Sequence, residues 1–303
     1  MLFFLIPFSA KNNRISEVAD VPSVRELRIL SWNIYMLPQA ITLTDNAKRA
    51  RCIGEFLRNG EFDIILFQEA FTAKNRSIIY KEIMDTYPYT YGPANNNQFD
   101  IRLNSGLWVV SKIPLRWIDA IEFRNSAGFD AFARKGALML EGELNRLRFQ
   151  IVNTHFHAGK YNNVRILQSR QLRSELLDVY KKEGVVQIVG GDFNVDKNDD
   201  ASFSELIYEL DARDYYSGHL CSYDKVTNDL AGGGDQGNSL IDHIFFRNHA
   251  FAGLHVIGRV LRVKKGWSER HHDLSDHYPV SATLSLLEEA TSVYAEASMF
   301  SRN

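Results

Sequence analysis

The segment Leu274-Ser275-Asp276-His277-Tyr278-Pro279-Val280 places a carboxylate and an imidazole immediately before an apolar, β-rich run. A second segment, Gly190-Gly191-Asp192-Phe193-Asn194, places a carboxylate and an amide immediately after one. These groups bind metal ions and transfer protons, whereas a packed core has little use for them. The two segments therefore indicate that strands of this chain end at a chemical site.

The same arrangement recurs at four further strand ends. They are Ile29-Leu30-Ser31-Trp32-Asn33, Ile64-Ile65-Leu66-Phe67-Gln68-Glu69, Val152-Asn153-Thr154-His155 and Leu240-Ile241-Asp242-His243. Six strand ends that each carry a metal-binding or proton-transferring group are hard to explain as packing. We interpret them as one hydrolytic site assembled from the whole chain.

The composition is that of an ordinary globular protein, with 45% hydrophobic and 24% charged residues among 303. The net charge of −2 gives no general basic surface for nucleic acid, although a local basic patch or divalent metals can offset repulsion. The two cysteines, Cys52 and Cys221, can form a bridge or stay apart. Cys52 falls in a helical pattern and is expected to be a small core residue.

Three segments are expected along the chain. Residues 1–25 form an N-terminal apolar arm or signal remnant with a linker, residues 26–287 a catalytic domain, and residues 288–303 a helical tail. The apolar start is too short to span a membrane. It has the length of a signal-peptide core without a preceding basic stretch, so an export signal and an arm packed on the domain are both open.

Hydrophobic periodicity predicts alternating strands and helices. Strands are expected at 27–32, 62–67, 105–110, 136–142, 147–155, 185–189, 240–246, 256–263 and 280–286. Helices are expected at 46–58, 75–85, 163–181 and 203–210, and loops at 92–105 and 228–239. Strands covered by helices on one face predict an α/β fold in which two sheets are sandwiched between helices.

The polar groups suit hydrolysis of a phosphoester assisted by a metal. Asn33 and Glu69 offer the oxygen ligands that Mg²⁺, Mn²⁺ or Ca²⁺ prefer, and Mg²⁺ needs only one or two carboxylates. Asp192 can take a proton from water or orient it, while Asn194, two residues along an extended segment, faces the same way. No Cys/His cluster has zinc-finger spacing, so structural zinc is not expected.

Imidazoles supply the remaining groups. Adjacent residues on a strand point apart, so Asp242 is a better partner for His277 than Asp276 is. A carboxylate-paired imidazole holds one tautomer and is a stronger base. His155 can donate to an oxygen of the developing phosphorane.

Each residue also has a plainer explanation when it is taken alone. Asp192-Phe193-Asn194 can be a turn, Asn33 can cap a helix, and His155 can be a core histidine. The conjunction of all of them favours a site. The other histidines, His157, His243, His271 and His272, lack such support and are expected in loops or at the surface.

The quoted strand ends resemble the endonuclease/exonuclease/phosphatase superfamily, the fold of DNase I, over residues 27–286. The resemblance implies a four-layered α/β/β/α sandwich and a metal-dependent phosphoesterase. Further segments are similar to bacterial neutral sphingomyelinases: Ser31-Trp32-Asn33-Ile34-Tyr35-Met36-Leu37, Arg49-Ala50-Arg51-Cys52-Ile53-Gly54, Glu69-Ala70-Phe71, the stretch 105–114, and Ala127-Gly128-Phe129-Asp130 followed by Lys135-Gly136.

The resemblance implies a metal centre. Glu69 is the principal ligand with Asn33 beside it, and Asp276 is a water-mediated partner. The ion it implies is Mg²⁺, with Mn²⁺ or Co²⁺ as alternatives. Lys135 is expected to bind substrate phosphate or to steady a loop.

The resemblance also implies the catalytic groups. His155 and Asn194 stabilise the transition state, and Asp192 positions or activates the attacking water. His277 is a general base or acid that Asp242 orients, and the group that takes the first proton stays open.

Secreted bacterial sphingomyelinases carry a long hairpin with an aromatic tip between the equivalents of Asp242 and the final Asp-His pair. Here that interval spans only residues 244–275 and holds one tryptophan, Trp267. Phe251, Trp267 or the N-terminal arm are candidates to replace the hairpin at a membrane.

The leading hypothesis is a secreted or periplasmic, monomeric, Mg²⁺-dependent sphingomyelinase of phospholipase C type. Its partner is sphingomyelin or another phospholipid at a membrane surface, and no stable nucleic-acid partner is expected. Alternatives are a cytoplasmic location, a DNase I-like endonuclease, and a phosphatase acting on inositol lipids or other phosphoesters. A binding protein that has lost catalysis is disfavoured, because every expected site residue is present.

Overall fold

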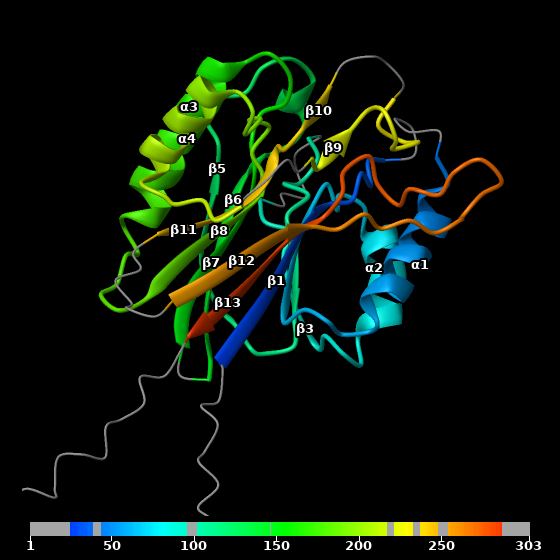
Figure 1. Cartoon of the computed structure of the whole chain (residues 1–303), viewed down its shortest axis with the longest axis horizontal. Helices are drawn as coiled ribbons and strands as arrows, with labels where there is room; N and C mark the ends of the chain where they lie inside the picture. The colour runs from blue at the N-terminus through cyan, green and yellow to red at the C-terminus, as the bar shows by residue number, and fades with distance from the viewer. Residues whose placement is uncertain are drawn as a thin grey trace, which may run out of the picture.

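Two mixed β-sheets lie face to face in the computed structural model, and a pair of helices covers the outer side of each (Figure 1). The structure describes residues 25–38, 44–95, 102–145, 147–216, 221–232, 237–247 and 254–286. The expected N-terminal arm, the C-terminal tail and Phe251 lie outside these residues. No helix in the described ranges has the length and apolar character needed to cross a membrane.

The first sheet has six strands in the order β12-β13-β1-β2-β4-β3. These are β1 (Arg25–Asn33), β2 (Ile64–Gln68), β3 (Tyr89–Tyr91), β4 (Trp108–Ser111), β12 (Leu254–Val260) and β13 (Val280–Leu286). Two helices, α1 (Asn46–Leu57) and α2 (Ala73–Ile83), cover its outer face.

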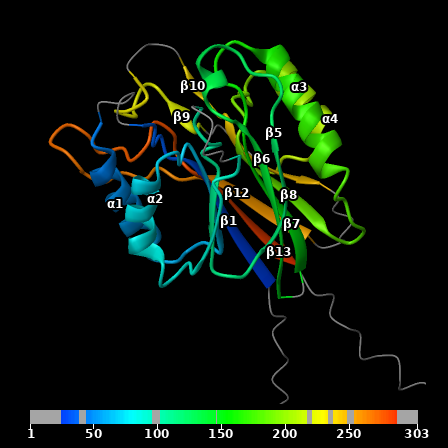
Figure 2. The ribbon, with the colours of Figure 1, turned by 180° about the vertical axis from the view of Figure 1, so that it is seen from behind.

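The second sheet has five strands in the order β11-β8-β7-β6-β5. These are β5 (Arg116–Glu122), β6 (Gly136–Leu144), β7 (Leu147–His155), β8 (Val186–Asp192) and β11 (Asp242–Arg247). The helices α3 (Asn162–Leu172) and α4 (Asp200–Leu210) cover its outer face, as the reverse view in Figure 2 also shows. A short ribbon pairs β9 (Tyr223–Asp224) with β10 (Asn238–Ser239).

The central strands, such as β2, β4, β8 and β11, are buried along their whole length because both faces of the sheets are covered there. In β1, Leu27 and Ile29 pack between the sheets, whereas Leu30 and Trp32 pack under the helices. This alternation follows from the two-residue period of a strand. It explains why the strands read as continuous apolar runs, the pattern of a sheet buried on both sides.

Parallel pairing brings the polar strand ends together. β1 pairs with β2 in a register that sets Asn33 beside Gln68, so Glu69 follows directly. β7 pairs with β8 so that His155 lies beside Asp192. β11 runs antiparallel to β8 and begins with Asp242 opposite Asp192. One edge of the sandwich therefore collects the functional groups.

Two glycines make room for close neighbours behind that edge. A Cβ on Gly190 would lie 2.6 Å from Leu66 Cδ1 of the facing sheet, and one on Gly191 would lie 2.0 Å from the carbonyl oxygen of Thr154 on the adjacent strand β7 of the same sheet. Both distances are far below contact distance. The glycine pair before Asp192 is thus required by packing.

The predicted sandwich is confirmed, with local corrections. The strand expected at 105–110 begins at Trp108, and the strand expected at 256–263 ends at Val260. The helix expected at 163–181 ends as an α-helix at Leu172 and continues as a π-helical turn, Arg173–Leu177. The strand β5 was not predicted, because it is only partly buried and a bulge between Trp117 and Asp119 interrupts its alternation.

Candidate active site

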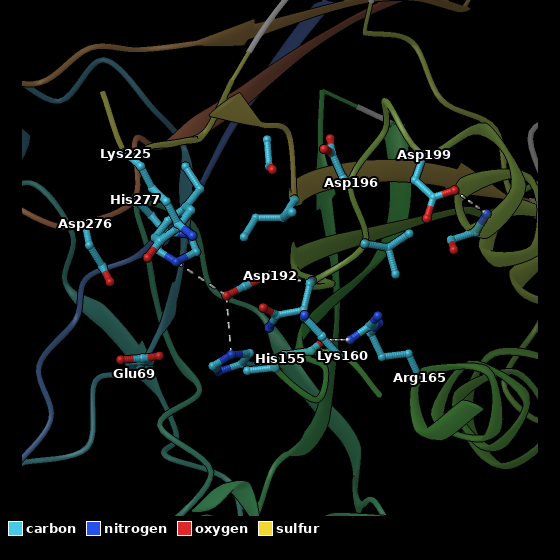
Figure 3. Close-up of a pocket in the computed structure, with 18 residues that line it drawn as sticks. Glu69, His155, Lys160, Arg165, Asp192, Asp196, Asp199, Lys225, Asp276 and His277 are labelled. Carbon is cyan, nitrogen blue, oxygen red and sulfur yellow. Dashed lines mark hydrogen bonds and ion pairs between the residues drawn. The ribbon is translucent and has the colours of Figure 1, made fainter. Parts of the chain in front are cut away.

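The strand ends converge on one polar cavity of about 620 Å³ (Figure 3). Six of the predicted site residues line it: Glu69, His155, Asp192, Asn194, Asp276 and His277. The other three, Asn33, Asp242 and Lys135, each lie within hydrogen-bonding distance of a lining residue. The structure therefore brings all nine together, while the roles assigned to them stay predictions.

His277 lies between two aspartates. Its Nδ1 is 2.8 Å from Asp242 Oδ2, and its Nε2 is 3.9 Å from Asp192 Oδ2. Asp242, rather than the adjacent Asp276, is thus the hydrogen-bonding partner of the imidazole. The carboxylate fixes the ring orientation and leaves Nε2 for the cavity.

The surrounding charges shift the pKa of both His277 and Asp192. Burial disfavours the imidazolium, but Asp242, Asp192 and Asp276 together raise the pKa of His277 well above its usual value. Burial, with Asp242 adding to it, raises the pKa of Asp192 to about 6. At neutral pH His277 therefore carries a proton, whereas Asp192 is mostly ionised and can accept one.

Glu69 and Asp276 lie on the same side of Asp192 and form the best candidate for a cation site (Figure 3). Burial raises the pKa of Asp276 to about 6 and Glu69 adds to the shift, and burial likewise raises the pKa of Glu69. Glu69 Oε2 is buried with no hydrogen-bonding partner among the described residues. Burial disfavours the negative charge of both carboxylates, and one carboxylate oxygen has no hydrogen-bonding partner. A hard divalent cation would stabilise that charge and bind that oxygen.

Asn33 connects this pair to Asp192. Its Nδ2 donates to Glu69 Oε1 at 3.2 Å and to Asp192 Oδ2 at 3.0 Å, while its Oδ1 accepts from the backbone N of Tyr35. In this arrangement the amide positions two carboxylates. The predicted role of Asn33 as a metal ligand stays a prediction.

A second group with the right ligand types for a metal is Asp192, Asp242 and His277, whose ligand atoms lie within 4.8 Å of one another. A metal-binding imidazole must be neutral. The raised pKa of His277 opposes that state, so a cation bound here would have to displace the imidazole proton.

Lys135 positions His155 rather than lining the cavity. The Lys135 ammonium donates to Asp130 Oδ2 at 2.8 Å and to the Phe156 carbonyl at 3.0 Å, and it lies 3.0 Å from His155 Nε2. An ammonium can only donate, so the imidazole accepts there. Burial, followed by the Lys135 charge, lowers the pKa of His155 well below its usual value, and the ring is neutral.

Asn194 departs from the extended geometry that the sequence analysis assumed. β8 ends at Asp192, and Asn194 adopts the left-handed conformation with φ 53°. Its backbone N donates to Asp192 Oδ1 at 3.0 Å, and its Nδ2 donates to the Phe156 carbonyl at 3.1 Å. Glu69 is left-handed as well, with φ 56°, and such strain is typical of functional sites.

Two histidines expected in loops or at the surface are buried. His243 lies on a strand, which corrects the prediction, whereas His157 does lie in a loop but not at the surface. His243 follows Asp242 on β11 and so faces the opposite way, where it stacks on Phe245 under α4. His157 Nδ1 lies 2.9 Å from Asp130 Oδ2, the same oxygen that Lys135 binds.

Trp267 is also buried, and its indole N donates to the Asp273 carbonyl. The tryptophan is therefore not available as a membrane contact. Cys52 and Cys221 are both free thiols, so the open question of a bridge between them is answered.

Several residues of the site were not singled out from the sequence. Arg49 of α1 is fully buried and donates to the carbonyls of Ile34, Tyr35 and Leu274 in the loops that carry Asn33 and Asp276. Its only sequence signal was its place in a segment of family resemblance.

Tyr223 lines the cavity with its ring centroid 5.0 Å from that of His277, and burial raises its pKa to about 12. Lys160, Arg165 and Lys225 add positive charge to the lining. These three cations lie in ordinary loops and near a helix start, which gave no signal, whereas Tyr223 belongs to a segment, Ser222-Tyr223-Asp224, that is similar to bacterial neutral sphingomyelinases.

The endonuclease/exonuclease/phosphatase family matches residues 30–277, and the chain belongs to this family. It is 27% identical to Sphingomyelinase C of Bacillus cereus, covering 86% of this chain and 89% of the relative. It is 25% identical to Phospholipase C of Staphylococcus aureus, covering 85% and 87%.

The crystal structure of beta toxin from Staphylococcus aureus has the same fold, with a TM-score of 0.76 at 24% identity over 84% of this chain and 99% of the toxin. A variant of that toxin has been crystallised with bound magnesium ions. The fold is thus the predicted DNase I-like sandwich, and the chain is an enzyme of the phosphodiesterase type.

Proposed function

We propose that the protein is a Mg²⁺-dependent sphingomyelinase, which hydrolyses sphingomyelin to ceramide and phosphocholine at a membrane surface. The observation that carries the chemistry is the row Asp242–His277–Asp192, placed beside the carboxylates of Glu69 and Asp276 in one cavity. Support for the substrate comes from the relatives, several of which are named sphingomyelinase C.

Glu69 and Asp276 are the residues that would hold Mg²⁺. When bound, the ion supplies Lewis-acid stabilisation of charge on the phosphoryl oxygens. Magnesium in a variant of the related toxin supports the choice of ion.

Asp192 activates the attacking water in the mechanism that we propose. Its carboxylate is ionised near neutral pH and retains a pKa of about 6, so it can accept a proton as the water oxygen bonds to phosphorus. Asn33 and the backbone N of Asn194 hold the carboxylate in place through hydrogen bonds to its two oxygens.

His277 protonates the departing ceramide oxygen as the phosphorus–oxygen bond breaks. Its raised pKa keeps a proton available, and Asp242 stabilises the charge of the ring. After the step the proton is on Asp192 and missing from His277. The 3.9 Å between Oδ2 and Nε2 is longer than a hydrogen bond, so the proton returns when the two groups move closer or through one water molecule.

The experiment that tests this function measures phosphocholine release from sphingomyelin vesicles in Mg²⁺ and in EDTA, beside phosphatidylcholine vesicles and plasmid DNA. We expect Mg²⁺-dependent release from sphingomyelin alone. The matched controls are His277→Ala, expected to be inactive, and His272→Ala, whose imidazole is largely exposed and expected to be dispensable. DNA cleavage that disappears in His277→Ala would replace the proposal with a nuclease.

A further inference from the structure

Three exposed apolar side chains belong to segments next to the lining of the catalytic cavity. Phe132, Tyr161 and Val226 are 62%, 48% and 68% exposed. Tyr161 follows Lys160 and Val226 follows Lys225, and both lysines line the cavity. We call Phe132, Tyr161 and Val226 the apolar rim.

Phe132 joins this rim through the short helix η1 (Gly128–Phe132), which lies against the cavity wall. Asp130 of η1 accepts a hydrogen bond at 2.7 Å from the backbone N of Ala158, a residue of the cavity lining. On the same side, Tyr161 packs its ring against His157 with centroids 4.8 Å apart. Phe132 and Tyr161 thus belong to neighbouring segments beside the cavity lining.

Val226 belongs to another segment beside the lining, since Lys225, which precedes it, lies across Asp192 from Lys160 in Figure 3. It occupies a tight turn after β9, where its backbone N donates to Asp224 Oδ1 at 3.0 Å. In Figures 1 and 2, β9, β10 and the start of α3 all lie at the same end of the molecule. The apolar rim is therefore held on anchored backbone at the end where the cavity opens.

We infer that the apolar rim is the surface through which the enzyme docks on a phospholipid bilayer. This inference rests on the proposed function and names its contact with the substrate membrane. The ceramide of sphingomyelin is anchored in the bilayer, so its phosphodiester reaches Asp192 only when the cavity opening meets the headgroup layer.

The chemistry of the rim matches that layer. Aromatic and aliphatic side chains insert at the boundary between headgroups and acyl chains, and a tyrosine keeps its hydroxyl in the polar part. The ammonium groups of Lys160 and Lys225, beside the rim, complement the phosphates of the headgroups. Trp267, the candidate from the sequence, is buried and cannot take this role.

The test measures binding of the full-length protein with Mg²⁺ to phosphatidylcholine vesicles by co-sedimentation. Phe132→Ser and Val226→Ser should each weaken vesicle affinity by about tenfold, since each removes one inserted apolar side chain. Tyr208→Ser is the matched control, because Tyr208 is 76% exposed on α4 and lies outside the cavity lining. Its vesicle affinity should equal that of wild type.

A second measurement reports insertion directly. The Phe132→Trp variant should show more quenching by lipids brominated in their acyl chains than wild type, whose exposed tryptophan is Trp117 on β5. Unchanged vesicle affinity in Phe132→Ser and Val226→Ser, or no extra quenching in Phe132→Trp, would overturn the docking surface.

Measurements of enzymatic activity distinguish a failure of this inference from a failure of the proposed function. On a water-soluble, short-chain sphingomyelin, Phe132→Ser should retain wild-type kcat/KM, while its rate on sphingomyelin vesicles at low lipid concentration falls about as much as its affinity. If wild type releases no phosphocholine from either substrate, the proposed function fails. The vesicle-binding comparison still decides the role of the rim in that case.

Discussion

At the scale of single residues, two neighbouring groups of the site differ in protonation: one carries a proton and the other is ionised. His277 keeps its proton because three carboxylates surround it, and Asp192 is ionised near neutral pH although burial raises its pKa. In the proposed mechanism this difference makes His277 the acid and Asp192 the base. Asp192 is then the group that takes the first proton.

If His277 donates a proton and Asp192 accepts one, the activity lost on replacing each residue should depend differently on the leaving group. On sphingomyelin, His277→Ala and Asp192→Asn should each lower kcat/KM by about a thousandfold. With a p-nitrophenyl ester of phosphocholine, whose leaving group needs no proton, His277→Ala should recover at least about tenfold of its loss. Asp192→Asn should recover none. Equal recovery by the two variants would contradict the assignment.

The proposed role of Glu69 as a metal ligand predicts how Mg²⁺ changes the free energy of unfolding. Mg²⁺ at a hundredfold excess over its Kd should raise the free energy of unfolding of wild type by about 2.7 kcal/mol. Glu69→Gln should lose this increment. In EDTA it should be more stable than wild type, because burial disfavours the Glu69 carboxylate when no cation is bound.

Thermal unfolding in Mg²⁺ and in EDTA checks both statements. Glu61→Gln is the control, since its carboxylate is exposed and outside the cavity lining. A Glu69→Gln protein that keeps the full Mg²⁺ effect would remove Glu69 from the metal site.

At the scale of elements, α1 holds the site together through one buried arginine. The guanidinium of Arg49 joins the loop after β1 to the loop before His277 by hydrogen bonds to backbone carbonyls. Burial lowers its pKa to about 10, yet it stays charged at neutral pH. The helix thus contributes to the site although none of its residues lines the cavity.

Removing this link should destabilise the fold. Arg49→Met leaves several buried carbonyls without a donor and should lower the free energy of unfolding by about 3 kcal/mol. Arg51→Met, on the exposed side of the same helix, should change it by less than about 0.5 kcal/mol. Urea unfolding of the two variants checks this difference, and equal stability would show that the buried hydrogen bonds contribute little.

The elements also show what the sequence could predict. The pairing of His277 with Asp242 was predicted from strand alternation, and the pairing is confirmed although Asp276 and His277 lie before β13 in a bend and an isolated bridge. The left-handed conformation of Asn194 was not, because its surroundings impose it. The burial of His157 depends on Asp130, 27 positions away in the chain, and a single sequence gives no signal for such a contact.

At the scale of the whole molecule, the site depends on the close approach of two sheets. The polar strand ends belong to both sheets, and buried side chains connect them, as where Gln68 of β2 donates to Asn153 of β7 at 2.7 Å. The sandwich architecture was predictable from the continuous apolar strands, whereas the sheet spacing was not.

The spacing can be tested at Gly190. A Cβ there would lie 2.6 Å from Leu66 in the core between the sheets, so Gly190→Ala should lower the free energy of unfolding by about 1–3 kcal/mol. Gly266→Ala is the control, because its Cβ would make an ordinary contact at 3.6 Å. A Gly190→Ala protein as stable as this control would mean that the sheets can separate without cost.

The central claim is that water, activated in this cavity, attacks phosphorus and displaces ceramide. Hydrolysis of sphingomyelin by the Mg²⁺-loaded protein in ¹⁸O-labelled water, followed by mass spectrometry of both products, tests it most directly. We predict the label in phosphocholine and none in ceramide. Label in ceramide, release of free choline instead of phosphocholine, or no hydrolysis would contradict the account.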